Sequence, residues 1–475
     1  MTAARLTGCS LVLASGLAAG QFALTYDPSP PLSRDGSSLP LAWAGGLNFV
    51  QVSDIDLDGD GDKDLFVFDR SGDEAVFLLN NGTSGTDGYT ITHAYDHVYP
   101  FSTLENWALM RDYDADGRED LFAAVNAGFA VYRNVSGDGV LAFELIDDLV
   151  GSDYDPVYSP NINTYGTDVP GFADIDGDGD LDLLTFGIGN QLDYHSNQSV
   201  ELYGHTDSLI YRVRNRCWGY FAESGSSSTI QLDYICAYNV EDPELPVIGH
   251  GETTALDRAD VGSTMLPIDL DGDGDKDLLI GDVQSPNIIA LTNGGDQDSA
   301  YMVAQDPHFP AYDEPIELDR FVGTFYVDVD NDGVRDLLAS PSFGGQSENL
   351  RSLWYYQNIG PDDVPVFSKR SENLFQRDMF DVGEGAWPVL FDFDGDSLMD
   401  LIVANYGYYS PDIVFPARLI ALRNTGTATA PAFTVVSEDY ASLGSSGLGN
   451  AMYPAFGDLD GDGDKDLYVG DRQGR

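Results

Sequence analysis

The stretch 269-DLDGDGDKDLLIGD-282 places five aspartates in its first nine positions, and only Lys276 offsets them. Two carboxylates about 4 Å apart repel each other by roughly 4 kcal/mol at an effective dielectric constant near 20. Several carboxylates held together raise one another's pKa or force the loop open, unless a positive charge lies among them. The stretch therefore predicts a bound cation.

The same spacing, D-x-D-x-D-G-x-x-D-L, occurs seven times along the chain, and we number these segments as the first to seventh loops. They begin at Asp56, Asp112, Asp174, Asp269, Asp328, Asp392 and Asp458. The starts are 56 to 66 residues apart, apart from one interval of 95 residues. Every copy keeps the four aspartates and the leucine, whereas the glycine is replaced once, by Ser397. The chain is therefore built from repeats.

Each loop lies between two apolar segments of strand length, such as LNFVQVS before the first loop and LFVF after it. A third apolar run that ends in Asn or Gly follows in several units, as in AVFLLNNG and RLIALRNTG, and a fourth follows in some. Four short strands in about 60 residues are typical of a β-propeller blade, which must stack on its neighbours to bury its faces. We predict an all-β fold, a single seven-bladed β-propeller of four-stranded antiparallel blades.

The residue types in the loops match calcium, which takes six to eight oxygen ligands in a tolerant geometry. Positions 1, 3, 5 and 9 offer carboxylates, position 7 offers a backbone carbonyl, and glycine at position 6 permits the tight turn. Up to seven calcium ions are expected. The predicted ligands are Asp56, Asp58, Asp60, Asp62 and Asp64; Asp112, Asp114, Asp116, Arg118 and Asp120; Asp174, Asp176, Asp178, Asp180 and Asp182; Asp269, Asp271, Asp273, Asp275 and Asp277; Asp328, Asp330, Asp332, Val334 and Asp336; Asp392, Asp394, Asp396, Leu398 and Asp400; Asp458, Asp460, Asp462, Asp464 and Asp466.

Two other interpretations explain the loops less well. An EF-hand shares D-x-D-x-D-G but needs flanking helices and a glutamate at position 12, where this chain has apolar residues such as Val67 and Ile280. Solvated acidic turns without metal do not explain why four positions recur in all seven copies. Calcium therefore remains the prediction.

The seven loops, each opening into D-L and an apolar strand, resemble the FG-GAP/VCBS repeats of integrin α-chain propellers and of secreted bacterial proteins. The resemblance covers nearly all of residues 45–475 and implies calcium in the hairpin between the first two strands of each blade. It implies no particular ligand, because integrin propellers carry such loops in only some blades. Ser397 departs from the pattern, so we expect a weaker sixth site.

Composition limits the partners of the chain. The 475 residues carry 79 acidic and 23 basic side chains, a net charge of −56, while hydrophobic residues make up 43%. This charge repels nucleic acid and anionic membranes, and the apolar fraction suffices for a core. No segment after the N-terminal region has transmembrane length. We expect a monomer.

The N-terminus predicts secretion. Arg5 precedes a short apolar run, and Ala18-Ala19-Gly20 resembles a cleavage site, so residues 1–20 are expected to be a signal peptide and residues 21–475 the propeller. Cleavage would leave Cys217 and Cys236, for which an exported protein favours a disulfide; two buried thiols are the alternative. The protein is expected outside the cell or at its surface.

The repeats are irregular in two places. The long interval after Asp174 predicts an insertion at about 200–250 in the third blade, which holds both cysteines. The seventh blade lacks its later strands before residue 475, and FALTYD at 22–27 was expected to supply one of them.

No catalytic residues are predicted, because motifs such as G-x-S-x-G and H-E-x-x-H are absent. We expect a module that binds an extracellular protein or polysaccharide on the face opposite the calcium loops. Candidate contacts are Phe343, Tyr406, Tyr408 and Tyr409, in connections between second and third strands. A carbohydrate-active lyase or hydrolase on the same scaffold is the alternative.

Overall fold

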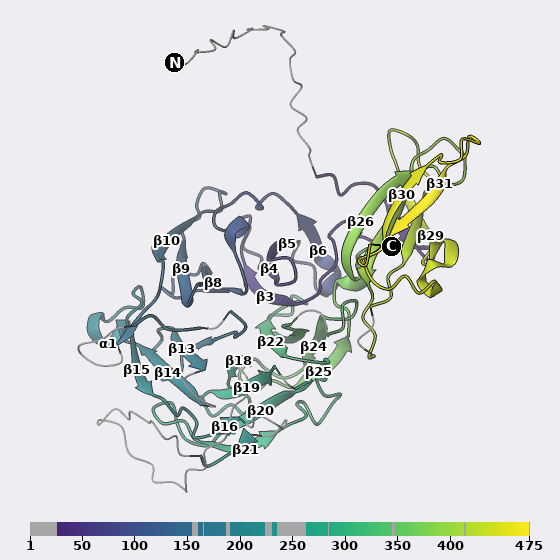
Figure 1. Ribbon diagram of the computed structural model, residues 1–475. Helices are drawn as coiled ribbons and strands as arrows, with labels where there is room; N and C mark the ends of the chain where they lie inside the picture. Colours follow the sequence, from purple (N-terminus) through teal and green to yellow (C-terminus); the bar gives the residue numbers. More distant parts are fainter. Residues whose placement is uncertain are drawn as a thin grey trace, which may run out of the picture.

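A computed structural model describes residues 26–153, 160–164, 166–186, 191–223, 230–234, 263–283, 285–343, 347–412 and 415–474 (Figure 1). Within these residues the chain is all-β, with one five-residue helix, α1 (Ser199–Tyr203), and short 3₁₀ turns. None of the helices in the described ranges is long and apolar enough to cross a membrane. The predicted fold class is thus confirmed at the level of antiparallel β-sheets.

Each loop belongs to one sheet, and six of these seven sheets contain four consecutive antiparallel strands, alone or extended by further strands. The first sheet holds β3 (Val50–Ile55), β4 (Asp64–Asp69), β5 (Glu74–Asn80) and β6 (Tyr89–Thr92). The second holds β7 (Ala108–Arg111), β8 (Asp120–Val125), β9 (Gly128–Asn134) and β10 (Phe143–Asp147). The third holds β12 (Gly171–Ala173), β13 (Asp182–Phe186), β14 (Leu192–Asn197) and β15 (Tyr211–Asn215), with β11 (Ser152–Asp153) parallel to β15.

The later sheets repeat this order and then depart from it. The fourth holds β18 (Ser263–Ile268), β19 (Asp277–Asp282), β20 (Ile288–Asn293) and β21 (Met302–Asp306). The fifth holds β22 (Val322–Val327), β23 (Asp336–Pro341), β24 (Trp354–Asn358) and β25 (Phe367–Ser371). The sixth holds β26 (Glu384–Phe391), β27 (Asp400–Gly407), β28 (Leu419–Asn424) and β29 (Phe433–Ser437), extended by β1 (Leu32–Arg34) and β2 (Ser37–Ser38). The seventh holds only β30 (Tyr453–Gly457) and β31 (Asp466–Gly470).

Burial of the second strand explains the unbroken apolar run that follows a loop. Every residue of β4, DLFVFD, is buried, as is every residue of β13 and β23. A strand that is covered on both faces shows no alternation of polar and apolar residues. Outer strands such as β10 are largely exposed, so each of the first five sheets runs from a buried inner edge to a more exposed outer edge.

Five sheets surround a common centre (Figure 1). The first strands contact one another from β3 to β7, from β12 to β18, from β18 to β22 and from β22 back to β3. Rings of Phe122 and Phe172, 4.7 Å apart at their centroids, join the second sheet to the third. The sixth and seventh sheets lie to one side, where β26 contacts β30.

The arrangement differs from the predicted single ring of seven sheets, and the fifth sheet supplies the reason. Val50 N donates to Ser340 Oγ at 3.1 Å, and the Leu47 carbonyl accepts from Ser352 Oγ at 2.7 Å. The fifth sheet thereby occupies the side of β3 that a seventh sheet would need. These contacts are specific to a few serines, and the repeat motif carries no information about them.

The N-terminal strand also differs from its predicted place. It was expected at residues 22–27 as part of the seventh sheet, but residues 26–27 are in no strand and residues 22–25 lie outside the described ranges. Instead β1 pairs in parallel with β29 of the sixth sheet, with Leu32 opposite Phe433. The predicted signal peptide, residues 1–20, also lies outside the described ranges.

The insertion in the third unit begins later in the chain than the predicted position, about residue 200. Residues 211–215 form β15, the fourth strand of the third sheet, so the extra chain follows it. A short hairpin of β16 (Ala222–Glu223) and β17 (Ile230–Gln231) lies in this part. Cys217 is fully buried and disulfide-bonded, while the predicted partner Cys236 lies outside the described residues.

Candidate metal centres

All seven loops connect the first and second strands of a sheet, and the aspartate at position 9 is the first residue of the second strand in every unit. On the face where the ring's loops lie, Asp112, Asp174 and Asp269 line a single cavity of about 600 Å³. The loops therefore bring carboxylates from different sheets to one face of the ring.

The position 9 aspartates are the most constrained residues of the loops. In the first loop, Asp64 Oδ2 accepts from Leu57 N at 2.8 Å and Oδ1 accepts from Asn80 N at 2.7 Å. The same pair of bonds occurs in the first six loops, in which these aspartates are at most 1% exposed, at Asp64, Asp120, Asp182, Asp277, Asp336 and Asp400. Through these hydrogen bonds, each of the six carboxylates connects its loop to the last residue of the third strand.

The asparagine that donates this backbone bond is a residue that sequence reasoning treated only as a strand terminator. It recurs as Asn80, Asn134, Asn197, Asn293, Asn358 and Asn424. In four units its Nδ2 also donates to the carbonyl of position 8, as Asn134 does to Glu119 at 3.1 Å. Its recurrence at the end of the third apolar run was the signal that could have identified it.

The position 1 aspartates shape the turn. Asp269 Oδ1 accepts from Gly272 N at 2.7 Å, and Oδ2 accepts from Gly274 N at 3.1 Å. The residues at position 6 all have positive φ, between 73° and 100°. Ser397 takes φ 73° and donates its N–H to Asp392 Oδ2 at 3.0 Å, as the glycine at this position does in five of the other loops. The sixth loop therefore keeps the turn, at the cost of a left-handed backbone for a residue with a Cβ.

Carboxylate oxygens converge within the loops. Oxygens of positions 1, 3 and 9 lie within 4.8 Å of one another in the first three loops, as at Asp56, Asp58 and Asp64. In the fourth loop the same holds for positions 1, 3 and 5, Asp269, Asp271 and Asp273. Position 7 includes Arg118, Val334 and Leu398, whose side chains bear no ligand oxygen, so that position can contribute only through its backbone.

Several loop oxygens are buried without a hydrogen-bond partner among the described residues. These are Asp178 Oδ2, Asp180 Oδ1, Asp275 Oδ1, Asp328 Oδ1 and Asp330 Oδ1. A buried acceptor with no donor costs about 1–3 kcal/mol, and more when it is charged. A hard cation that takes oxygen ligands would satisfy these atoms, so the residues present fit calcium.

Electrostatics support the same fit. Burial raises the pKa of Asp64 to about 6 and the pKa values of Asp120, Asp277 and Asp336 to about 7, and neighbouring loop carboxylates raise them further. The N–H donors act in the opposite direction. Burial likewise raises the pKa of Asp182 well above its ordinary value. Without a cation, burial and the repulsion between neighbouring carboxylates disfavour the ionised form of these aspartates.

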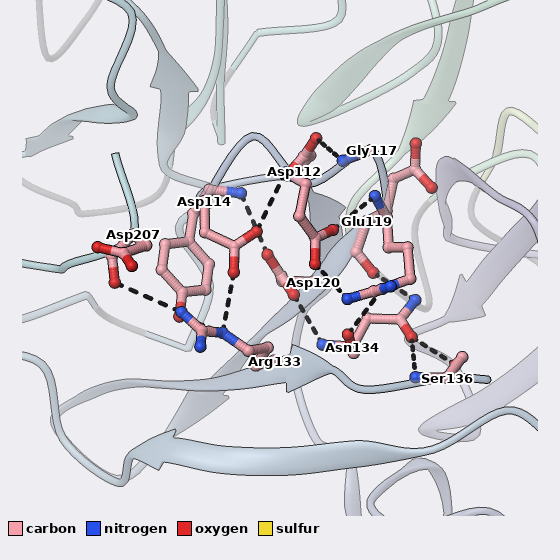
Figure 2. A network of polar contacts seen from close by, with 12 residues as sticks. Asp112, Asp114, Gly117, Glu119, Asp120, Arg133, Asn134, Ser136 and Asp207 are labelled. Atoms are coloured by element: carbon pink, nitrogen blue, oxygen red, sulfur yellow. Dashed lines mark hydrogen bonds and ion pairs between the residues drawn. The ribbon is translucent and has the colours of Figure 1, made fainter. Parts of the chain in front are cut away.

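The second loop carries cationic side chains of its own (Figure 2). Arg133 Nε lies 2.9 Å from Asp114 Oδ2 and donates to Tyr113 OH at 3.1 Å. Arg118, at position 7, pairs with Asp116. Asn134, below Asp120 in the figure, closes the network towards Ser136. Two guanidinium groups thus neutralise part of this loop.

A second candidate site lies at the opposite ends of the strands, between the ring and the sixth sheet. A cavity of about 570 Å³ is lined by the β4–β5 connection, the β23–β24 connection and β26. Four aromatic residues line it, the buried Phe49 together with Phe343, Trp387 and Tyr406. The polar side chains around them include Asn48, Asp73 and Asn106. Arg70 on its wall donates to the Gly166 carbonyl at 2.7 Å.

The predicted ligand contacts divide between this cavity and the packed edge of the sixth sheet. Phe343, which is 43% exposed, and Tyr406 line the cavity. Tyr408 and Tyr409 are half-buried, and Tyr409 OH donates to Asp319 Oδ1 at 2.9 Å. Trp387 was missed, because nothing in its local sequence distinguishes it from a core tryptophan.

Comparison with known proteins gives a local match. Residues 392–469, which contain the sixth loop and end in β31, match a family described as FG-GAP-like repeat. The chain thus carries an FG-GAP-like repeat in this part. No curated protein matches the chain.

Two solved structures are similar to the chain at low identity. One is an Agrocybe aegerita lectin described as recognising non-reducing terminal N-acetylglucosamine, with 12% identity, a TM-score of 0.29, and coverage of 82% of this chain and 79% of that one. The other is the V. cholerae biofilm matrix protein Bap1, with 11% identity, a TM-score of 0.22, and coverage of 91% and 80%. At these TM-scores, function has to be argued from the chain's own residues.

Proposed function

We propose that the protein is an extracellular, calcium-stabilised β-propeller module that binds a polysaccharide or protein ligand. In this proposal the five-sheet ring is the propeller, and the sixth sheet forms one wall of the ligand site. The observation that carries the proposal is the recurrence of one carboxylate geometry in loop after loop, with buried oxygens that lack a donor.

The role of calcium is mainly structural. Each ion would join the first and second strands of a sheet at positions 1, 3, 5 and 9, next to the buried bond between position 9 and the third strand. Affinities of about 10⁻⁴–10⁻³ M, as in other extracellular modules, would suffice. Magnesium fits less well, because it demands near-ideal octahedral geometry and keeps several of its waters.

The calcium proposal is tested by thermal melting with and without a chelator. In 1 mM calcium we expect a single high transition, and excess EGTA should lower it by more than about 10 °C because the loop carboxylates then repel one another. Adding back calcium should restore the transition, while equimolar magnesium should restore less of it. A melt that is unchanged in excess EGTA would contradict the proposal.

Secretion is supported by the disulfide at Cys217, since such bonds persist in oxidising compartments. The signal-like N-terminus agrees with it. Residues 1–25 lie outside the described ranges, so the evidence from the N-terminus comes from its sequence. N-terminal sequencing of the protein recovered from the culture medium should begin at or near Gln21; an intact Met1 would argue against export.

The ligand site is proposed at the cavity of Phe343, Trp387 and Tyr406. Aromatic rings beside amide and carboxylate side chains suit a sugar ring, which offers an apolar face and a polar edge, and they also suit a protein side chain. Glycan-array and extracellular-protein screening of the calcium-loaded protein would identify which it is.

A matched pair of variants tests whether the ligand binds in this cavity. Trp387→Ala should weaken binding at least tenfold, whereas Tyr99→Ala, an aromatic residue that is 57% exposed outside the cavity, should not change it. Equal binding by both variants would move the ligand site elsewhere. Release of cleaved product from a bound polysaccharide would instead favour the enzymatic alternative.

A further inference from the structure

The third loop has a second acidic cluster that the repeat pattern does not contain. Carboxylate oxygens of Asp176, Asp178 and Glu201 lie within 4.8 Å of one another. Glu201 belongs to α1, which lies between β14 and β15 and is the one α-helix in the described residues. This cluster is distinct from the group of Asp174, Asp176 and Asp182, which corresponds to the metal group of the first two loops.

A buried carboxylate beside the cluster has an oxygen without a partner. Asp180 is 1% exposed, and its Oδ2 accepts from Val200 N at 3.1 Å, which joins the loop to α1. Its Oδ1 is buried and has no hydrogen-bond partner. Asp180 lies next to the cluster, because its own N–H donates to Asp178 Oδ1 and its carboxylate accepts from Val200, the neighbour of Glu201. Asp178 Oδ2 is a second buried oxygen without a donor.

Protein donors reach only part of this cluster. Asp178 Oδ1 accepts from Asp180 N at 3.0 Å, and Asp180 Oδ2 accepts from Val200 N. Glu201 Oε1 accepts from Gln198 Nε2 at 3.0 Å, and Arg214 lies 3.6 Å from the same oxygen. Asp178 Oδ2 and Asp180 Oδ1 remain without a donor. A single guanidinium group at one edge does not neutralise four carboxylates.

We propose that the third loop binds a second divalent cation, held by Asp180 and Glu201, with Asp176 and Asp178 shared between this ion and the ion of the loop itself. Four carboxylates from two elements form a hard oxygen site suited to calcium. The ion would tie α1 to the loop. The site rests on the proposed calcium function, but it depends on a helix that lies outside the repeat.

The test is calcium stoichiometry, measured by equilibrium dialysis with radioactive calcium on the full chain. Glu201→Gln and Asp180→Asn should each bind about one ion fewer per chain than the wild type. Glu144→Gln is the matched control, because Glu144 is an exposed carboxylate on β10 that belongs to none of the loops. It should bind as many ions as the wild type.

Unchanged stoichiometry in Glu201→Gln would overturn the second site, even if one ion bound more weakly, since Glu201 would then be an extra ligand of the loop's own ion. Glu201 is exposed, so this variant should fold; the melting temperature in saturating calcium verifies it. A wild type that binds no calcium would overturn the proposed function as well. The two failures are therefore distinguishable.

Discussion

The second and third loops share one motif but differ in the charges around it. In the second loop, Arg118 and Arg133 lie against the carboxylates of Asp116 and Asp114. In the third loop, position 7 is Asp180, and Glu201 adds a further carboxylate from α1. In the second loop, arginine side chains neutralise part of the carboxylate charge. In the third loop, additional carboxylates increase the negative charge. The motif thus sets where carboxylates meet, and neighbouring elements set how much cation they require.

The largest expected effect is the loss of a position 9 aspartate. Asp120→Ala and Asp182→Ala each strand two buried N–H donors, at about 1–3 kcal/mol for each donor, and both remove a proposed ligand. Urea unfolding in calcium should show a loss of about 2–6 kcal/mol for each variant. The larger loss is expected for Asp182, because Tyr194 OH also donates to it at 3.1 Å.

The seventh loop provides the control for this prediction. Asp466 is half-buried and accepts from Leu459 N at 2.9 Å, with no third strand in its sheet. Asp466→Ala should therefore cost about 1 kcal/mol or less in the same assay. A cost equal to that of Asp182→Ala would show that burial of position 9 does not determine its contribution.

The next effect is the pH dependence of the calcium-free protein. Burial raises the pKa of Asp120 from 3.8 to about 7 and also raises that of Asp182 well above its ordinary value, so the folded state binds protons that the unfolded chain releases. A raised carboxyl pKa contributes stability that is present below pH 4 and lost as the pH rises through about 7. The calcium-free protein should melt several degrees higher at pH 5 than at pH 8.

Calcium should reverse this trend, because bound ions favour the ionised carboxylates. The measurement is melting between pH 4.5 and 8 on protein stripped with a chelating resin, with and without added calcium. The pH dependence without calcium should be reduced in both Asp182→Asn and Asp120→Asn, because each variant removes a carboxyl whose pKa is raised by burial. A calcium-free melting temperature that rises with pH would refute the assigned charge balance.

The smallest effect is expected from Arg133, which is partly exposed. Arg133→Gln removes the cation at Asp114 and should lower the stability of the calcium-free protein by about 0.2–1 kcal/mol, the usual range for an exposed ion pair. In saturating calcium the loss should shrink, because the ion takes over the neutralisation. Arg377→Gln, whose partners Asp87 and Asp378 lie outside the loops, should lose the same amount in both conditions.

Much of the local fold could be predicted from the sequence. The seven hairpins, the buried second strands and the aspartate that opens each second strand follow from a short-range pattern. The ring did not follow, because its closure depends on contacts between distant residues, such as Ser340 with Val50 and Ser352 with Leu47. The partner of β1 is likewise determined by pairing across the chain.

The candidate sites likewise contain residues that a local sequence pattern predicts and residues that it does not. The loop carboxylates were predicted from spacing alone, and the recurring asparagine, such as Asn134, could have been added from its periodicity. Glu201 and Trp387 could not, since each comes from an element that no repeat position specifies. Their roles emerge only when α1 meets the third loop and β26 meets the ring.

The most direct test of the account is the calcium content of the mature protein, measured by elemental analysis after dialysis against millimolar calcium and corrected for free ion. The account predicts about seven ions per chain from the loops and one more from the site at Glu201. A chain that is folded and holds no calcium would contradict it.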